Sequence, residues 1–475
     1  MAFRRLVAFG LVAISAGVLA VACSSTSRPQ GTFDPDGGDD ATALVPEGGG
    51  DGPSLISPET STTGCPEGSP TRITGKVYDP AGKNALYNIQ VFVPSGDLPP
   101  IPVGLPDPDP NTVRCAAGQT CDSQILNPKA AALTNTKGEF ELKGPKLFPG
   151  KDVPLVMQVG KWRRKIVIPE VKACEETKLD AKTTRLPKNG TEGDMPHMMM
   201  VLGSYDALEC LLYGIGIDND EFVPGYTEAE KNKHVHVFKG SGGGATVNGK
   251  PVPDVNDAWS AAYKMQKFDI ALLACEGTTT LDNKPNMNAF KNFADWGGRV
   301  FATHFHSQWI TGDPAGQKGD AWSEKVLLRS GGTTGTNPYS INTSFPKGQA
   351  FSDWLYEIGA SSTRDKISLN SSDVSNYQGG PAPGSPAKTW IAGNLSTPNT
   401  AKYISFNTPT EVPVADQCGR FVYSDIHAAG AGSGGDPLPT SSCSGLSAQL
   451  TALEFMFFDL SSCVQDETKP PEPPK

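Results

Sequence analysis

Two short apolar segments, separated by a helix-like stretch, constrain the fold of this chain more than any other feature. The first covers residues 268–275 (FDIALLAC), and the second covers residues 299–306 (RVFATHFH). Strand, helix and strand at this spacing predict a βαβ unit of a buried parallel sheet. Open α/β sheets bind ligands at the carboxyl ends of their strands. At that edge we expect the side chains of Glu276, Thr303, His304 and His306.

The remaining segments between residues 197 and 463 continue this pattern. HMMMVLG, HVHVFKG, KYISFNT and GRFVYSDIHA predict further strands. SYDALECLLYGIG predicts a helix with Ser204 as its N-cap, DVNDAWSAAYKMQKF and SFPKGQAFSDWLYEIGA predict two more, and SGLSAQLTALEFMFFDLSSC predicts a closing amphipathic helix. Residues 361–402 show no clear periodicity. His197, His234 and His236 lie at strand starts, so we expect them at the opposite rim in structural roles.

The first 23 residues have the pattern of an export signal. Two arginines precede an apolar run over residues 6–21, which is shorter than most membrane-spanning helices. The sequence LAVAC at its end resembles a bacterial lipobox. This resemblance implies that Cys23 is lipidated and anchors the protein to a membrane. Ser24 then favours the outer membrane of the cell envelope, whereas the unusual Ala20 leaves ordinary secretion as the alternative.

Composition limits the partners and marks the tethers. Residues 24–70 contain almost no large apolar residue and predict a disordered tether, and residues 464–475 predict a disordered Pro-rich tail. The formal net charge is −10, without a basic patch, which argues against a nucleic-acid partner. We expect instead a protein or glycan partner in the envelope.

Nine cysteines remain after Cys23, and export permits disulfides between them. Cys115 and Cys121 bracket a short loop and are predicted to pair. Two of Cys418, Cys443 and Cys463 are expected to pair as well. Because nine is an odd number, one thiol should stay free, and Cys275 at the end of an apolar strand is the candidate.

Short alternating strands with turns between them occupy residues 71–187 and predict a β-sandwich, including a hairpin that turns at Gly160-Lys161. This region resembles the carboxypeptidase regulatory-like family, a transthyretin-like sandwich. The resemblance implies a non-catalytic spacer, support or binding module. It depends on Gly75, Val77, Asp79, Gly82, Leu86, Val91, Val93, Thr134, Gly138, Phe140 and Leu142.

Residues 197–463 resemble the class I glutamine amidotransferase-like superfamily, with the trehalose-utilisation-type branch nearest. The resemblance depends on FDIALLACEG, GGRVFATHFH and GRFVYSDIH, and it implies a flavodoxin-like, doubly wound parallel sheet. Working members carry a cysteine nucleophile after the strand that matches RVFAT, where this chain has Thr303-His304. His427 matches the late histidine, but alanines follow it where the family has glutamate. Glutaminase chemistry is therefore not expected.

Two functional hypotheses follow. The favoured one is a non-catalytic binding or assembly role for a degenerate amidotransferase-like domain. The alternative is a metal-dependent hydrolase or metal binder, because His304 and His306 would share one face of an extended strand end. Together with His427 and Asp425 or Glu276 they could hold a zinc-like ion. A hydroxyl nucleophile at Thr303 with His427 as base, and helix capping by Glu276, are further interpretations.

Overall fold

The computed structural model describes residues 65–66, 69–106, 127–241, 246–277, 283–312, 322–326, 328–375, 378–428, 437–438, 443 and 445–472. These residues belong to one compact unit, Glu59–Lys475. The export signal with Cys23, nearly all of the 24–70 tether and the proposed Cys115–Cys121 pair lie outside the described residues. Within the described residues, no helix has the length and apolarity that crossing a membrane requires.

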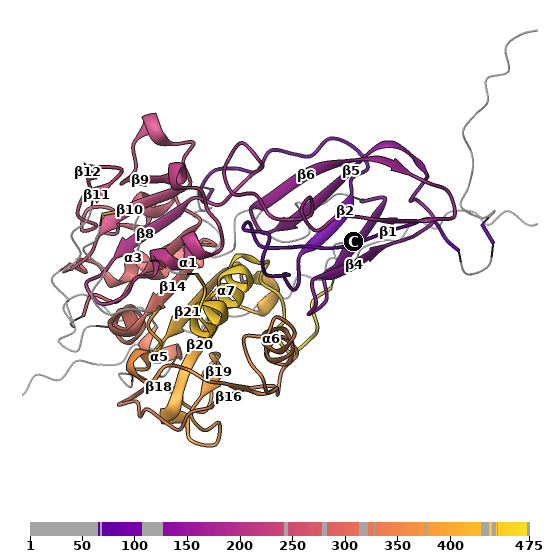
Figure 1. Ribbon diagram of the computed structural model, residues 1–475. Coiled ribbons are helices and arrows are strands. Elements are labelled where there is room, and N and C mark those ends of the chain that lie inside the picture. Colours follow the sequence, from indigo (N-terminus) through magenta and orange to yellow (C-terminus); the bar gives the residue numbers. More distant parts are fainter. Residues whose placement is uncertain are drawn as a thin grey trace, which may run out of the picture. The chain divides into compact units, whose positions relative to one another are not determined.

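Two antiparallel-rich sheets form the sandwich over residues 72–178 (Figure 1). One sheet has the order β4-β1-β7 and the other β3-β2-β5-β6. Ile73, Phe140, Val91 and Leu155 from the two sheets are fully or almost fully buried in one shared apolar core. The strands are β1 (Arg72–Lys76), β2 (Gln90–Val93), β3 (Ala130–Leu133), β4 (Glu139–Leu142), β5 (Gly150–Val159), β6 (Trp162–Val171) and β7 (Glu176–Lys178).

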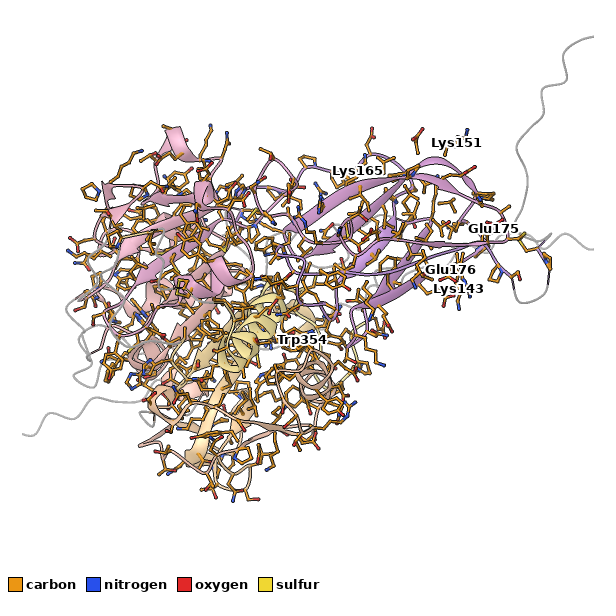
Figure 2. The ribbon with its side chains drawn as sticks, in the orientation of Figure 1. Lys143, Lys151, Lys165, Glu175, Glu176 and Trp354 are labelled. Carbon is orange, nitrogen blue, oxygen red and sulfur yellow. A yellow bond between two sulfur atoms is a disulfide. The ribbon has the colours of Figure 1, made fainter. Side chains whose placement is uncertain are left out.

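The hairpin between β5 and β6 turns at Gly160 and Lys161, as the sequence predicts, because Val159 faces Trp162 across it. Gly160 has a φ of +53°, which favours glycine. A Cβ atom at this position would lie 2.0 Å from the Ser461 carbonyl oxygen, so the turn also requires glycine for its close approach to the C-terminal helix. Lys151 and Lys165 extend from the exposed side of this hairpin (Figure 2).

A ten-stranded sheet forms the second core, and six of its strands run parallel in the order β21-β14-β13-β8-β10-β9. The parallel pairing of the two apolar segments is confirmed, since Ile270 to Leu273 align with Arg299 to Ala302. The parallel strands are β8 (Met198–Leu202), β9 (Phe222–Pro224), β10 (Val235–Lys239), β13 (Ile270–Leu273), β14 (Arg299–Thr303) and β21 (Gly419–Ser424). β8 and β13 are buried at every position, as a sheet covered on both faces requires.

Four antiparallel strands extend this sheet beyond β21, in the order β20-β19-β16-β17. They are β16 (Tyr339–Ile341), β17 (Lys366–Ile367), β19 (Lys388–Ala392) and β20 (Ala401–Thr408). β20 is the predicted KYISFNT strand, whereas β17 and β19 come from the stretch whose sequence has no clear period. Two further sheets have two strands each. One pairs β11 (Thr246–Val247) with β12 (Lys250–Pro251), and the other pairs β15 (Leu328–Ser330) with β18 (Gln378–Pro381). Helices and several sheets together give a mixed α/β fold.

The helices are α1 (Glu209–Gly214), α2 (Ala262–Met265), α3 (Met287–Asp295), α4 (Gln308–Thr311), α5 (Ser323–Val326), α6 (Pro346–Glu357) and α7 (Ala448–Ser461). Two sequence predictions about them were wrong. Ser204 does not cap α1, whose N-cap is Leu208, because the Ser204 hydroxyl donates to the Glu276 carbonyl oxygen. The helix predicted over residues 254–268 is reduced to the four residues of α2.

The prediction that the closing helix α7 is amphipathic was also wrong, because every residue from Gln449 to Ser461 is buried. One side of α7 packs on β14 and β21. Its Phe457 and Phe458 meet the Trp162 ring of the sandwich edge to face, with centroids about 6 Å apart. Trp354 of α6 lies next to α7 (Figure 2) and donates its indole N–H to the Ala85 carbonyl oxygen of the sandwich. A helix covered on two sides shows no polar stripe.

Cys65–Cys174 and Cys210–Cys443 are disulfide-bonded pairs within the described residues. Cys443 therefore pairs with a cysteine of α1 and not with a neighbour in sequence. Cys418 and Cys463 are also disulfide-bonded. Cys275 is free and buried, as the odd number of cysteines predicts.

Candidate metal centre

Four neighbouring strands of the parallel sheet each place one polar side chain just beyond their carboxyl ends. Asp206 follows β8, Cys275 follows β13, His304 follows β14 and His427 follows β21. The donor atoms of Cys275, His304 and His427 all lie within 4.8 Å of one another. Because parallel strands end at one edge of their sheet, residues as distant in sequence as Asp206 and His427 meet there.

His304 occupies the centre of this cluster. Its Nδ1 lies 3.2 Å from Cys275 Sγ, and its ring stands nearly perpendicular to that of His427, with centroids 4.9 Å apart. The backbone of His304 has a φ of +43°, a left-handed conformation that is uncommon for a residue with a side chain. Such strain persists where the surrounding structure fixes it, and it is common at functional sites.

Asp206 stands behind His427. Its Oδ2 lies 3.6 Å from His427 Nδ1, and its Oδ1 accepts the N–H of Ala428. Burial opposes the charged carboxylate, but nearby His427 and Thr303 outweigh burial, so the pKa of Asp206 is lowered. Asp206 is therefore an anion next to the His427 ring, at a distance too long for a direct hydrogen bond.

Burial keeps Cys275 and His304 in their neutral forms. It raises the pKa of the Cys275 thiol to about 12, with the charges of Asp206 and Glu276 adding to the effect. Burial and neighbouring His427 together lower the pKa of His304 to about 3. A protonated thiol is a poor nucleophile, whereas a neutral imidazole offers a lone pair to a metal, and a coordinating thiol loses its proton to the ion.

His306 does not join this cluster, although the sequence places it beside His304. Its Nε2 lies 2.9 Å from the Ala274 carbonyl oxygen, and its ring lies against Trp259. The chain stops being extended at His304 and forms a 3₁₀ turn over His304–Ser307. The expectation that both imidazoles share one face of a strand was wrong for this reason.

Asp425 and Thr303 are buried, and their side chains contact groups other than the three candidate metal ligands. Asp425 Oδ1 lies 2.5 Å from the Tyr423 hydroxyl, and its Oδ2 lies 3.9 Å from the Nζ of buried Lys402. The Thr303 hydroxyl lies 3.2 Å from the Leu273 carbonyl oxygen. Neither residue belongs to the cluster of possible metal ligands among the described residues.

Glu276 braces the loops around the centre. Its Oε1 accepts the N–H of Ser241 and a hydrogen bond from Asn283, and its Oε2 lies 2.6 Å from the Nζ of Lys284. The side chains of Glu276 and Lys284 are both fully buried. Burial opposes the negative charge of Glu276, but the attraction of His306 and Lys284 outweighs burial and lowers the pKa of Glu276. Glu276 does not cap α3, whose N-cap is Asn286.

Sequence reasoning identified His304 and His427 but missed Asp206, and it did not include Cys275 among the ligands. Asp206 sits in the segment Ser204-Tyr205-Asp206, and its only signal is a position shortly after a predicted strand. The expected free thiol of Cys275 could have indicated a metal ligand, because a cysteine left unpaired in a disulfide-containing chain is a candidate for metal binding or catalysis.

Comparisons with protein-family models, with curated proteins and with solved structures gave no match.

Proposed function

We propose that Cys275, His304 and His427 bind a zinc ion and that the protein is a metal-dependent hydrolase. The observation that carries this proposal is the convergence of the three donor atoms within 4.8 Å. Zinc bonds of about 2.0–2.3 Å in tetrahedral geometry place neighbouring ligand atoms roughly 3.3–3.6 Å apart. The 3.2 Å between Cys275 Sγ and His304 Nδ1 is close to that spacing, so modest side-chain movement completes the site.

The chemistry of the donors supports zinc and an open coordination position. One thiol and two imidazoles suit a borderline-soft divalent ion. Three protein ligands leave the fourth position to water, which is the arrangement of catalytic zinc sites, whereas structural sites use four protein ligands. Asp206 lies 3.6 Å from His427 Nδ1, and a small movement on metal binding would give the carboxylate–histidine–metal arrangement that orients the ring and increases its basicity.

The strand order supports our proposal that this domain is flavodoxin-like and related to the amidotransferase-like superfamily. Taken in chain order, β8, β10, β13, β14 and β21 lie in the sequence 2-1-3-4-5 across the sheet. The strained residue after β14 is His304, at the position where working amidotransferases carry their nucleophile. A non-catalytic binding or assembly role is the second candidate function. It is favoured because His304 stands where working amidotransferases carry their cysteine nucleophile. The seven-stranded sandwich is compatible with a carboxypeptidase regulatory-like support module.

We also propose that the protein is exported and anchored to the outer membrane through Cys23, where it would meet a protein or glycan partner. Cys65–Cys174 and Cys210–Cys443 support this location, because disulfides persist in oxidising compartments.

Metal analysis of protein purified without a histidine tag tests the zinc proposal. We expect about one zinc per chain, loss of that zinc in Cys275→Ser and in His304→Gln, and a lower melting temperature after chelation. His306→Gln is the matched control, because His306 is two residues from His304 but outside the cluster. Absence of stoichiometric metal together with unchanged stability in chelator would leave the cluster as a hydrogen-bonded brace and would favour the non-catalytic role.

A further inference from the structure

A cavity lies at the opposite end of the parallel strands from the candidate metal centre. Its volume is about 140 Å³, and its wall includes the first residues of β13 and β14 and the Gly160-Lys161 turn of the sandwich. Leu105, Pro106 and Ile270 supply apolar surface. Two cations, Lys161 and Arg299, also line it.

Arg299 forms no ion pair with a carboxylate among the described residues, although Asp459 and Asp269 attract it from farther away. Its guanidinium donates to the Cys418 and Ser462 carbonyl oxygens, and no described carboxylate lies within ion-pair distance of it. Burial and the positive charge of Arg420 together lower the pKa of Arg299 to about 10, against the attraction of Asp459 and Asp269. Carbonyl oxygens satisfy N–H groups but leave a full positive charge beside the cavity.

Lys161 already has its counter-ion. Its Nζ forms an ion pair with Asp269 and also donates to the Pro102 and Gly104 carbonyl oxygens. The second oxygen of Asp269 accepts the N–H of His197, so this carboxylate cannot turn to Arg299 without losing both partners. The charges of Lys161 and Asp269 cancel, and the cavity wall carries one net positive charge from Arg299.

We propose that this cavity binds a small organic monocarboxylate, with its carboxylate on Arg299 and its apolar body against Leu105, Pro106 and Ile270. Arginine pairs with carboxylates through two parallel N–H···O bonds, and such charge-assisted bonds are about twice as strong as neutral ones. An apolar cavity of roughly 150 Å³ holds a molecule the size of benzene. The volume of about 140 Å³ therefore suits an apolar body no larger than a benzene ring, such as that of benzoate or butyrate, next to the carboxylate on Arg299.

Titration calorimetry on the full chain with benzoate and butyrate tests this site, with benzamide as the neutral analogue. We expect saturable one-to-one binding of a carboxylate and no binding of benzamide. Arg299→Gln removes the charge while keeping a polar side chain with an amide donor, and it should weaken binding about tenfold to hundredfold. Arg364→Gln changes a half-exposed arginine elsewhere on the surface and should leave the affinity unchanged.

A second variant keeps the test decisive if Arg299→Gln fails to fold. Leu105→Trp fills the cavity while keeping the cation, and it should abolish carboxylate binding. Cys275→Ser should leave binding unchanged, which separates this site from the metal centre. No saturable binding of either anion, equal binding of benzamide, or unchanged affinity in Leu105→Trp would overturn the proposal.

Discussion

Cys275 Sγ lies 3.2 Å from His304 Nδ1, although 29 positions separate the two residues. The contact arises because β13 and β14 pair in parallel and end together, so that the residues following each strand share one edge. His427 arrives at the same edge after β21, which pairs with β14. The metal proposal therefore depends on sheet topology and on only three side chains.

Asp206→Asn should weaken zinc binding about tenfold to hundredfold without abolishing it, because Asp206 orients His427 and does not itself coordinate the ion. Competition with a chromophoric zinc chelator measures the effect. Asp257→Asn, which changes an exposed carboxylate, serves as the control. An affinity equal to that of the control variant would show that Asp206 has no part in the site.

Lys284→Met should lower the free energy of unfolding by about 3–5 kcal/mol, because it leaves the buried Glu276 carboxylate without its cation. The double variant Glu276→Gln, Lys284→Met should be less damaging, since the introduced glutamine is neutral and its side-chain oxygen can still accept the N–H of Ser241. Urea unfolding followed by circular dichroism measures both. Lys250→Met removes an exposed partner of Glu230 and should cost less than about 1 kcal/mol. A similar loss for Lys284→Met and Lys250→Met would contradict the assigned brace.

Asp79 and Glu454 predict a pH dependence of stability. Burial raises the pKa of Asp79 to about 6, and burial together with Asp79 raises the pKa of Glu454 well above its ordinary value. Because the folded state holds these protons more tightly, their stabilisation is complete below about pH 4 and is lost as the pH rises through 6 and beyond.

Glu454→Gln mimics the protonated acid and keeps an acceptor for the Asn84 amide. It should raise the free energy of unfolding at pH 8 and leave it little changed at pH 4. Glu170→Gln, at an exposed position, is the control. Thermal unfolding from pH 4 to pH 8 compares the variants, and parallel curves for wild type and Glu454→Gln would disprove the linkage.

The sequence could predict the parts of the fold that depend on continuous local patterns. The apolar runs that became β13 and β14 identify a buried parallel pair, and the alternating segments around Gly160 identify a hairpin. The lateral order of the strands depends on crossovers, which leave no local signal, so the meeting of Asp206 with His427 could not be read from the sequence.

His306 and α7 show two further limits. An extended strand end would align His306 with His304, but one left-handed residue at His304 redirects the chain and separates the two rings. The apolar face of α7 was visible in the sequence, whereas its second contact, with Trp162, requires the sandwich to pack against it. Both features depend on tertiary contacts that no sequence period encodes.

A cobalt titration of the tag-free chain, followed by absorption spectroscopy, tests the central claim most directly, because only a thiolate ligand gives an intense sulfur-to-cobalt charge-transfer band. We predict that this band saturates at one equivalent of cobalt, that zinc abolishes it by displacement, and that it is absent in Cys275→Ser but present in His306→Gln. A folded wild-type chain that shows no such band, or a band that persists in Cys275→Ser, would contradict the assignment of Cys275, His304 and His427 as a metal centre.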